Sequence, residues 1–234
     1  DLISLGNRLD KSYYGVKTSF IVNNSGISLS EEEIRLDIML SADGCFRREY
    51  NGLNVFEMHL SKKRKIERAQ LILDKCKISY KKTIGKNGTT YFYFSTDKKF
   101  DKSLSKYFTA NYRQLKIIAE ECLLWDGHKG YRSFYSTTDK LNADVIQFAF
   151  SAIDIRAGIS VVENEEWKNI YVVTPTKNNV IGITNTVKKV NSPDGKKYCF
   201  TVPSGYFVAR RNGRVFITGN CGMSFISTDV PANL

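Results

Sequence analysis

Two aspartates, each placed directly before a glycine at the end of a predicted helix, are the acidic residues of this chain whose placement suggests chemistry. Asp43-Gly44 follows residues 30–42 and Asp126-Gly127 follows residues 115–125, two segments with the apolar spacing of a helix. Ser30 with Glu33 predicts a capping box at the start of the first helix. The glycine after each aspartate is typical of the left-handed residue that ends a helix.

A carboxylate in the last turn of a helix opposes the helix macrodipole, so each position indicates a cation nearby. The candidates for holding a cation are therefore Asp43 and Asp126, with Gly44 and Gly127 beside them.

A second reactive pair, Asn220-Cys221, stands near the end of the sequence. The carboxamide nitrogen of Asn220 could attack its own carbonyl and break the bond to Cys221, and the Cys221 thiolate could first accept an acyl group. Most Asn-Cys pairs are inert surface residues, so the flanking sequence must show whether this pair is reactive. There Tyr198–Val202 and Val215–Ile217 alternate as strands do, and Asn212-Gly213 between them predicts a hairpin turn.

The middle of the chain repeats one order of elements after each Asp-Gly. In the first copy, strands around residues 45–60 precede a helix over 61–76 and strands over 80–95. In the second copy, strands over 131–137 precede a helix that begins at an Asp139 cap, followed by strands to Thr174. Two copies of one unit predict a pseudo-two-fold arrangement of an α+β fold.

The charge of the chain favours a nucleic-acid partner. The 35 Lys and Arg residues against 24 Asp and Glu give a formal net charge of +11. A generally solvated basic surface is the alternative, because the charge is spread along the chain. Five cysteines without CxxC spacing and two histidines argue against a structural zinc site and a disulfide framework. No signal peptide or membrane-spanning run is apparent, and we expect a reducing, cytoplasmic location.

The segments LDIMLSADG (Leu36–Gly44) and AEECLLWDG (Ala119–Gly127) resemble the two motifs of LAGLIDADG homing endonucleases. The resemblance implies a single-chain, monomeric endonuclease of two αββαββ halves that acts on double-stranded DNA, with Asp43 and Asp126 as catalytic acids. It also implies that these acids hold Mg²⁺ or Mn²⁺, because in-line hydrolysis of a phosphodiester needs a metal that activates water and stabilises the leaving oxygen, and magnesium prefers carboxylate ligands. Glu121 and Trp125 are bulkier than the small residues that this family prefers at the helix pair. The candidate DNA-contacting residues are Arg47, Arg48, Lys81, Lys82, Lys98 and Arg132, of which Lys98 and Arg132 are candidates for the basic group near the scissile phosphate.

The run from Tyr198 to Cys221 resembles the last two conserved blocks of the intein splicing domain, an all-β Hint-type fold. The resemblance implies that Asn220 cyclises and that Cys221 is the downstream nucleophile. Two positions that usually hold His are Gly219 and Tyr206 here. Cys199 stands where many inteins have Asp, and it is either an assisting group in catalysis or a buried structural thiol.

The two ends of the chain complete the expected organisation. The opening DLISLGNRL resembles the stretch after the first half of a splicing domain, which predicts a fragment or split piece that needs a missing N-terminal intein half. Residues 221–234 resemble a metal-binding segment of RtcB-type RNA ligases, although an unrelated host protein is the alternative. We expect a splicing remnant over 1–25, the endonuclease over 26–175, the C-terminal splicing half over 176–220 and the host protein over 221–234.

The leading hypothesis is a site-specific DNA endonuclease within an intein, cutting at the intein insertion site and carrying the C-terminal splicing segment. The alternative is a degenerate LAGLIDADG module that binds DNA without cleaving it. Retention of both Asp43 and Asp126 favours the enzyme.

Overall fold

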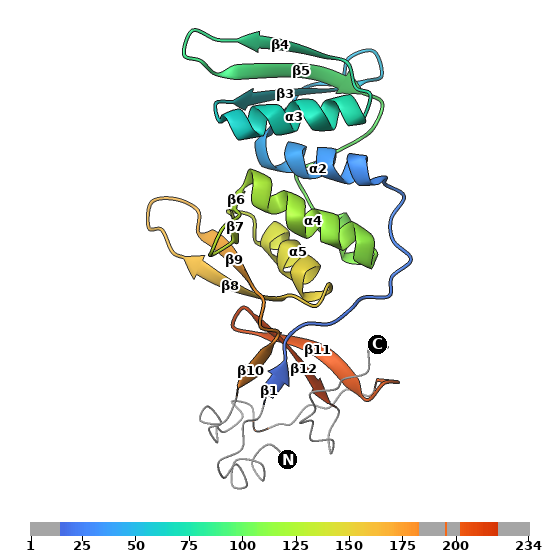
Figure 1. Cartoon of the computed structure of the whole chain (residues 1–234), viewed down its shortest axis with the longest axis vertical. Coiled ribbons are helices and arrows are strands. Elements are labelled where there is room, and N and C mark those ends of the chain that lie inside the picture. Colours follow the sequence, from blue (N-terminus) through green and yellow to red (C-terminus); the bar gives the residue numbers. More distant parts are fainter. Residues whose placement is uncertain (1–14, 183–194, 196–201, 220–234) are drawn as a thin grey trace.

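The computed structural model describes residues 15–182, 195 and 202–219, and within them one unit of helices and strands occurs twice. The helices α2 and α4 lie side by side at the centre of the molecule, with one half above them and the other below (Figure 1). The first half consists of α2 (Glu31–Asp43), β2 (Gly44–Phe46), β3 (Asn54–Leu60), α3 (Lys63–Lys75), β4 (Tyr80–Ile84) and β5 (Thr90–Thr96). The second consists of α4 (Tyr112–Trp125), β6 (Gly127–His128), β7 (Phe134–Thr137), α5 (Lys140–Ser151), β8 (Arg156–Val162) and β9 (Ile170–Thr176).

The order of the strands is the same in the two halves. The first sheet runs β2-β3-β5-β4, and the second contains β6-β7-β9-β8 in corresponding order, with all neighbouring pairs antiparallel. Each half is therefore an αββαββ unit, which confirms the repeat predicted from the sequence. Because β2 and β6 continue directly from α2 and α4, both helix ends lie at the inner edge of their sheets.

Side-chain caps fix where three of the four long helices begin. Ser30 and Glu33 form the predicted capping box at α2, and Asn111 with Gln114 forms a second one at α4. The Asp139 carboxylate accepts a hydrogen bond from the Asn142 N–H at the start of α5. Helix α3 begins at Lys63 rather than at Ser61, and its N-cap residue Lys62 makes no side-chain hydrogen bond to the helix.

The core lies between the central helices and the inner faces of the sheets. Ile34 and Met39 of α2 and Leu115 and Ile118 of α4 are fully buried. The bulky Trp125 is also buried, and its indole N–H donates to Glu121 Oε1 over 2.8 Å. Arg68 from α3 pairs with the same Glu121 carboxylate. The two large residues of the second motif therefore pack against α3, where a hydrogen-bonded ion pair compensates the burial of the charge.

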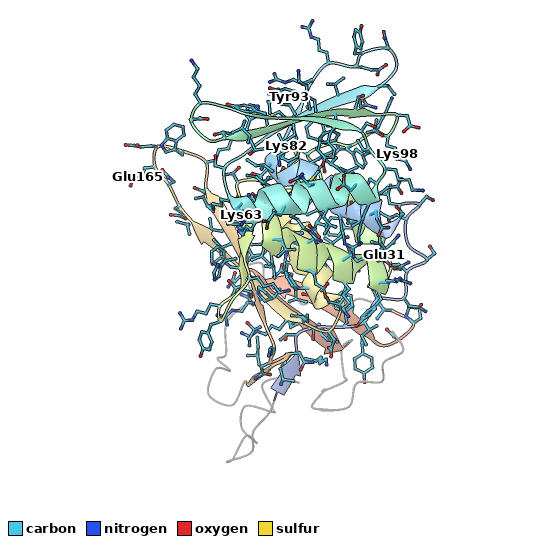
Figure 2. The ribbon with its side chains drawn as sticks, turned by 45° about the horizontal axis from the view of Figure 1, so that its top comes forward. Glu31, Lys63, Lys82, Tyr93, Lys98 and Glu165 are labelled. Carbon is cyan, nitrogen blue, oxygen red and sulfur yellow. The ribbon has the colours of Figure 1, made fainter. Side chains whose placement is uncertain are left out.

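One face of each sheet is covered by helices and the other is open. In the first sheet the buried Phe92 is the register partner of Lys82, whereas Tyr93 is the partner of Lys81. Side chains alternate between the faces of a strand, so Tyr93 and Lys82 emerge on opposite sides of the sheet (Figure 2). The open face is the one that carries Lys81 and Tyr93.

A hairpin near the C-terminal end of the described chain joins the second sheet. Its strands are β11 (Tyr206–Arg211) and β12 (Arg214–Gly219), and β12 pairs with β8 through Arg214 and Gly158. The turn residues Asn212 and Gly213 have φ values of 50° and 71°, as the type I′ turn predicted for Asn-Gly requires. Strand β12 pairs with β11 across this turn, and residues 198–201 of the strand expected over Tyr198–Val202 lie outside the described residues.

Short elements complete the described part of the fold. Strand β1 (Gly15–Lys17) pairs with β10 (Val180–Gly182), and the 3₁₀ helix η1 (Ser105–Thr109) lies in the linker between the halves. None of the helices in the described chain is long and apolar enough to cross a membrane.

Candidate active site

Asp43 and Asp126 converge on one lysine. Asp43 is the last residue of α2 and Asp126 caps α4. The ammonium nitrogen of Lys65 lies 2.5 Å from Asp43 Oδ2 and 3.9 Å from Asp126 Oδ1. Because these distances share one nitrogen, the two carboxylate oxygens are at most 6.4 Å apart, the sum of the two sides. The predicted pair of acids is therefore brought together at the junction of the two halves.

Lys65 is the functional residue that sequence reasoning missed. It lies in the first turn of α3, its side chain is only 11% exposed, and its ammonium stands 5.8 Å from the centre of the Trp125 ring. It supplies the cation that the unfavourable position of a carboxylate at a helix C-terminus indicated. The signal was its spacing, since Ala69 and Ile72 follow it at i+4 and i+7 and are both buried. That spacing places Lys65 on the inward face of α3.

Lys102, in the linker between the halves, is a second cation at the site. Its ammonium donates to the backbone carbonyls of Leu40 and Ser41, over 3.1 and 2.9 Å, at the C-terminal end of α2. Burial lowers the pKa of Lys102, while the charges of Asp126 and Asp43 act in the opposite direction. Lys102 therefore provides hydrogen bonds to the last carbonyls of α2 and places a positive charge near the two acids.

Hydrogen bonds from both halves hold the Lys102 segment in place. The Asn142 side chain of α5 accepts from the Leu104 N–H over 2.9 Å and donates to the Lys102 carbonyl over 2.8 Å. The Ser41 hydroxyl of α2 donates to the same carbonyl over 3.0 Å. Asn142 is the third residue of α5, as Lys65 is of α3. The first half therefore has Lys65 at this position. The second half has Asn142 at the equivalent position, and Asn142 holds the linker that carries Lys102.

The electrostatics of the acids favour a bound cation. Burial raises the pKa of Asp126, the nearby charge of Asp43 raises it further, and Lys65 and Lys102 lower it. At about 6 Å and an effective dielectric constant of about 20, two bare carboxylates would repel by about 3 kcal/mol. Lys65 offsets part of this repulsion, and a divalent cation would offset more of it.

The glycines after the two acids are required for space and not for a left-handed backbone. Gly44 has φ −79° and ψ 141°, and Gly127 is not among the residues with positive φ, so the predicted left-handed caps are wrong. A Cβ on Gly44 would lie 2.6 Å from the Leu40 carbonyl oxygen, and one on Gly127 would lie 2.7 Å from Leu123 Cα. In each half the backbone passes from the helix into the first strand while in close contact with the last turn of that helix. This contact fixes the direction of the preceding aspartate.

The donor set at the site fits magnesium or manganese. Within the described ranges, no group of three or more His, Cys, Asp or Glu side chains could hold a metal together. The acids offer two carboxylates, which is the protein contribution that Mg²⁺ commonly accepts when waters and substrate phosphates complete its coordination. A zinc site with three or four protein ligands does not match this arrangement.

The predicted DNA-contacting residues occupy different surroundings. Lys81 lies exposed on the open face of the first sheet, and Arg47 pairs with the Glu57 carboxylate, which His59 also contacts over 2.5 Å. Arg48 and Arg132 are exposed between strands.

Two of the lysines predicted to contact DNA do not lie on the open face of the first sheet. Lys82 donates to Gln70 of α3 over 3.0 Å on the helix-covered side. Lys98 pairs with Glu33 in the first turn of α2, at the end of that helix remote from Asp43 (Figure 2).

Of the positions assigned to splicing, Gly219 and Tyr206 are described. Gly219 ends β12 and is the register partner of Tyr206, the first residue of β11. These are the two positions at which the intein resemblance places histidines, and the hairpin makes them cross-strand neighbours. Asn220, Cys221 and Cys199 lie outside the described residues, as does the RtcB-like segment.

The chain was compared with known proteins. No protein-family model matches the sequence. The chain is 30% identical over 208 residues to the ribonucleoside-diphosphate reductase subunit beta of Aquifex aeolicus (strain VF5), a match that covers 80% of this chain. The chain spans 30% of the length of that relative.

Two solved structures resemble the fold. The homing endonuclease I-DmoI in complex with DNA and Mn is similar with a TM-score of 0.45 and 14% identity over 63% of this chain and 91% of that one. The N-terminal LAGLIDADG domain of WhiA is similar with a TM-score of 0.43 and 12% identity over 64% of this chain and 78% of that one.

Proposed function

We propose that this protein is a site-specific endonuclease that cuts double-stranded DNA with the help of Mg²⁺ or Mn²⁺. The convergence of Asp43 and Asp126 at the junction of two equivalent halves carries the proposal. One carboxylate from each half suits a duplex, because the two strands to be cut are also related by a two-fold axis. The net charge of +11 and the open faces of the sheets provide for binding to the phosphate backbone.

The residues of the site would divide the work as follows. Asp43 and Asp126 would hold the divalent cations, which would supply activation of water and neutralisation of the leaving oxygen. Lys65 neutralises the acids in the free protein. Its ammonium is also the basic group placed to neutralise negative charge on a phosphate beside the acids. Lys102 keeps its hydrogen bonds to the last carbonyls of α2, so that Asp43 stays in place when the charge at the site changes.

A randomised plasmid library tests this function without knowledge of the target. We expect double-strand breaks that recur at one sequence with Mg²⁺ and are absent with EDTA. Asp43→Asn and Asp126→Asn should each lower the yield of breaks at least a hundredfold, while Glu120→Gln, an exposed α4 residue, should not. A wild-type protein that shifts DNA on a gel and yields no breaks with Mg²⁺ or Mn²⁺ would establish the alternative, a binding module without cleavage.

We further propose that the C-terminal segment takes part in protein splicing, with Asn220 cyclising and Cys221 accepting the acyl group. The support is the resemblance of Tyr198–Cys221 to intein blocks, together with the hairpin that ends at Gly219 directly before Asn220. With an N-terminal intein half supplied in trans, Asn220→Ala should abolish release of the peptide that begins at Cys221. Unchanged release, measured by mass spectrometry, would remove Asn220 from this role.

We also propose a host protein into which this splicing element is inserted. The match to a ribonucleotide reductase subunit over 30% of its length is consistent with an element inserted in a longer protein. Residues 221–234 favour an RtcB-type RNA ligase as the host of this chain. Sequencing the gene upstream of Asp1 would decide. A frame open through an N-terminal intein half into ligase-like sequence supports the proposal, and a frame open through that half into an unrelated host sequence overturns it.

A further inference from the structure

The C-terminal hairpin extends the second sheet at its outer edge. Within the six-stranded sheet the order is β11-β12-β8-β9-β7-β6, so β6 lies next to the acids and the hairpin lies beyond β8. The first half has no corresponding addition within its described sheet, which ends at β4. The two halves therefore differ in how far they reach from the active site.

The tip of the hairpin is firmly docked on the second half. The Gly213 carbonyl accepts from the Ile159 N–H over 2.8 Å and from the Gln147 side chain over 2.7 Å. Arg210 pairs with Asp144 of α5 on the helix-covered side. A Cβ on Gly213 would lie 2.1 Å from the Ile159 carbonyl oxygen, so this position accepts only glycine. The tip is thus held in one place relative to β8.

Two arginines of the tip lie on the open face of the sheet. Arg214 is the register partner of Gly158, and Gly158 is the partner of Thr174, whose neighbour Val173 is fully buried against the helices. Arg211 is the partner of Arg214 across the hairpin. Because side chains alternate along a strand, Arg211 and Arg214 share the side of Thr174, opposite to Arg210.

Arg214 also borders a basic hollow on this face. Arg156 and Arg214 line a cavity of about 270 Å³, together with hydroxyl-bearing residues Ser160, Thr174 and Thr176. Within the part of the chain that the structure describes, none of Arg156, Arg211 and Arg214 forms an ion pair. Like charges placed directly across a strand pair are destabilising, so Arg211 and Arg214 indicate an anion that binds between them.

We infer that the tip of the hairpin is an additional contact for the backbone of duplex DNA, through Arg211 and Arg214, next to the second half-site. The inference rests on the proposed function, since DNA lying along the open faces would pass from the acids over β8 to the hairpin. Strands are about 4.8 Å apart, so two added strands extend the contact by about 10 Å, or about 3 base pairs at 3.4 Å each. The complex is then asymmetric, with the longer contact on the side of Asp126.

Salt dependence of DNA binding tests this inference directly. The probe is a 40-base-pair duplex of arbitrary sequence in EDTA, titrated with the full chain between 50 and 200 mM NaCl. Loss of two phosphate contacts should reduce the slope of log K against log salt by about 1.8. The affinity advantage of the wild type over Arg211→Gln/Arg214→Gln should therefore fall about twelvefold across this range. Lys75→Gln/Lys116→Gln, on helix surfaces away from the open faces, removes the same charge and should leave the slope unchanged.

A footprint locates the contact and separates the possible failures. Hydroxyl-radical footprinting on a duplex selected by the wild type should show protection shortened by about 3 base pairs on one side only in the arginine variant. Wild-type binding with equal slopes and footprints for both double variants would overturn the role of the hairpin and leave the endonuclease intact. Absence of salt-dependent binding by the wild type would overturn both proposals.

Discussion

Replacing Lys65 by Met should expose how strongly the two acids repel each other. The side chains of Lys65 and Asp43 are 11% and 24% exposed, so this ion pair is neither fully buried nor fully exposed. Breaking a fully buried ion pair costs about 3–5 kcal/mol, and an exposed pair contributes under about 1 kcal/mol. We therefore expect Lys65→Met to lower the free energy of unfolding by about 2 kcal/mol at pH 7. For a chain of this size that corresponds to a fall in Tm of about 4–8 °C.

Divalent cations should reverse this loss. Magnesium must compete with the Lys65 ammonium in the wild type, whereas in Lys65→Met the carboxylates are free to bind it. With a dissociation constant of about 1 mM, 10 mM MgCl₂ would stabilise the variant by about 1.4 kcal/mol. Differential scanning calorimetry with and without 10 mM MgCl₂ measures this, with NaCl added to equal ionic strength.

Lys63→Met provides the matched control. Lys63 is two residues away on α3, is 89% exposed and pairs only with Glu67 at 3.8 Å among the described residues, so its loss should change Tm little and leave the magnesium effect at the wild-type value. If Lys65→Met has the Tm and the magnesium response of the wild type, Lys65 does not neutralise the acids and the reasoning fails.

Three further predictions concern the geometry and charge of the same site. Gly44→Ala should lower the free energy of unfolding by about 2 kcal/mol in urea titrations, because its Cβ would clash with the Leu40 backbone; an unchanged midpoint would mean that α2 and β2 separate easily. Burial and Asp43 raise the pKa of Asp126, so the native state binds more protons than the unfolded state above the ordinary pKa of 3.8. The Asp126 contribution to stability should therefore fall as pH rises through that window, and Asp126→Asn should flatten this part of the pH profile; a profile identical to that of the wild type would refute the assignment. Asn142→Ala should increase hydrogen exchange at the Leu104 amide by about tenfold or more and lower the DNA-cleavage rate through Lys102, and unchanged exchange would show that the linker is held by other contacts.

Much of the fold could be predicted because local signals and the wider packing agree. Ser30, Glu33 and Asp139 fix helix starts through hydrogen bonds within one turn, and Asn212-Gly213 fixes its hairpin turn through backbone preference. The repeated order of elements required only periodicity. Strand β11, which pairs with β12, could not be placed from the sequence, because alternating apolar residues do not determine register and the residues next to the turn pair first.

The candidate site was only half predictable for a related reason. Asp43 and Asp126 carry a local signal, a helix end followed by glycine. Lys65 and Lys102 carry none of comparable strength, because the chain has many lysines and only long-range packing distinguishes them. Lys65 reaches the acids through the packing of α3, and Lys102 through hydrogen bonds between the linker and α5. The glycines were predicted as left-handed helix caps, whereas glycine at position 44 avoids a clash with Leu40 and does not adopt positive φ.

The measurement that tests the central claim most directly is Mn²⁺ binding followed by electron paramagnetic resonance in the presence of the selected duplex. If Asp43 and Asp126 jointly hold the catalytic cation, the wild type should remove free Mn²⁺ signal, and Asp43→Asn and Asp126→Asn should each weaken binding at least tenfold. Lys65→Met should retain or strengthen it. Equal binding by the wild type and both aspartate variants would contradict the claim.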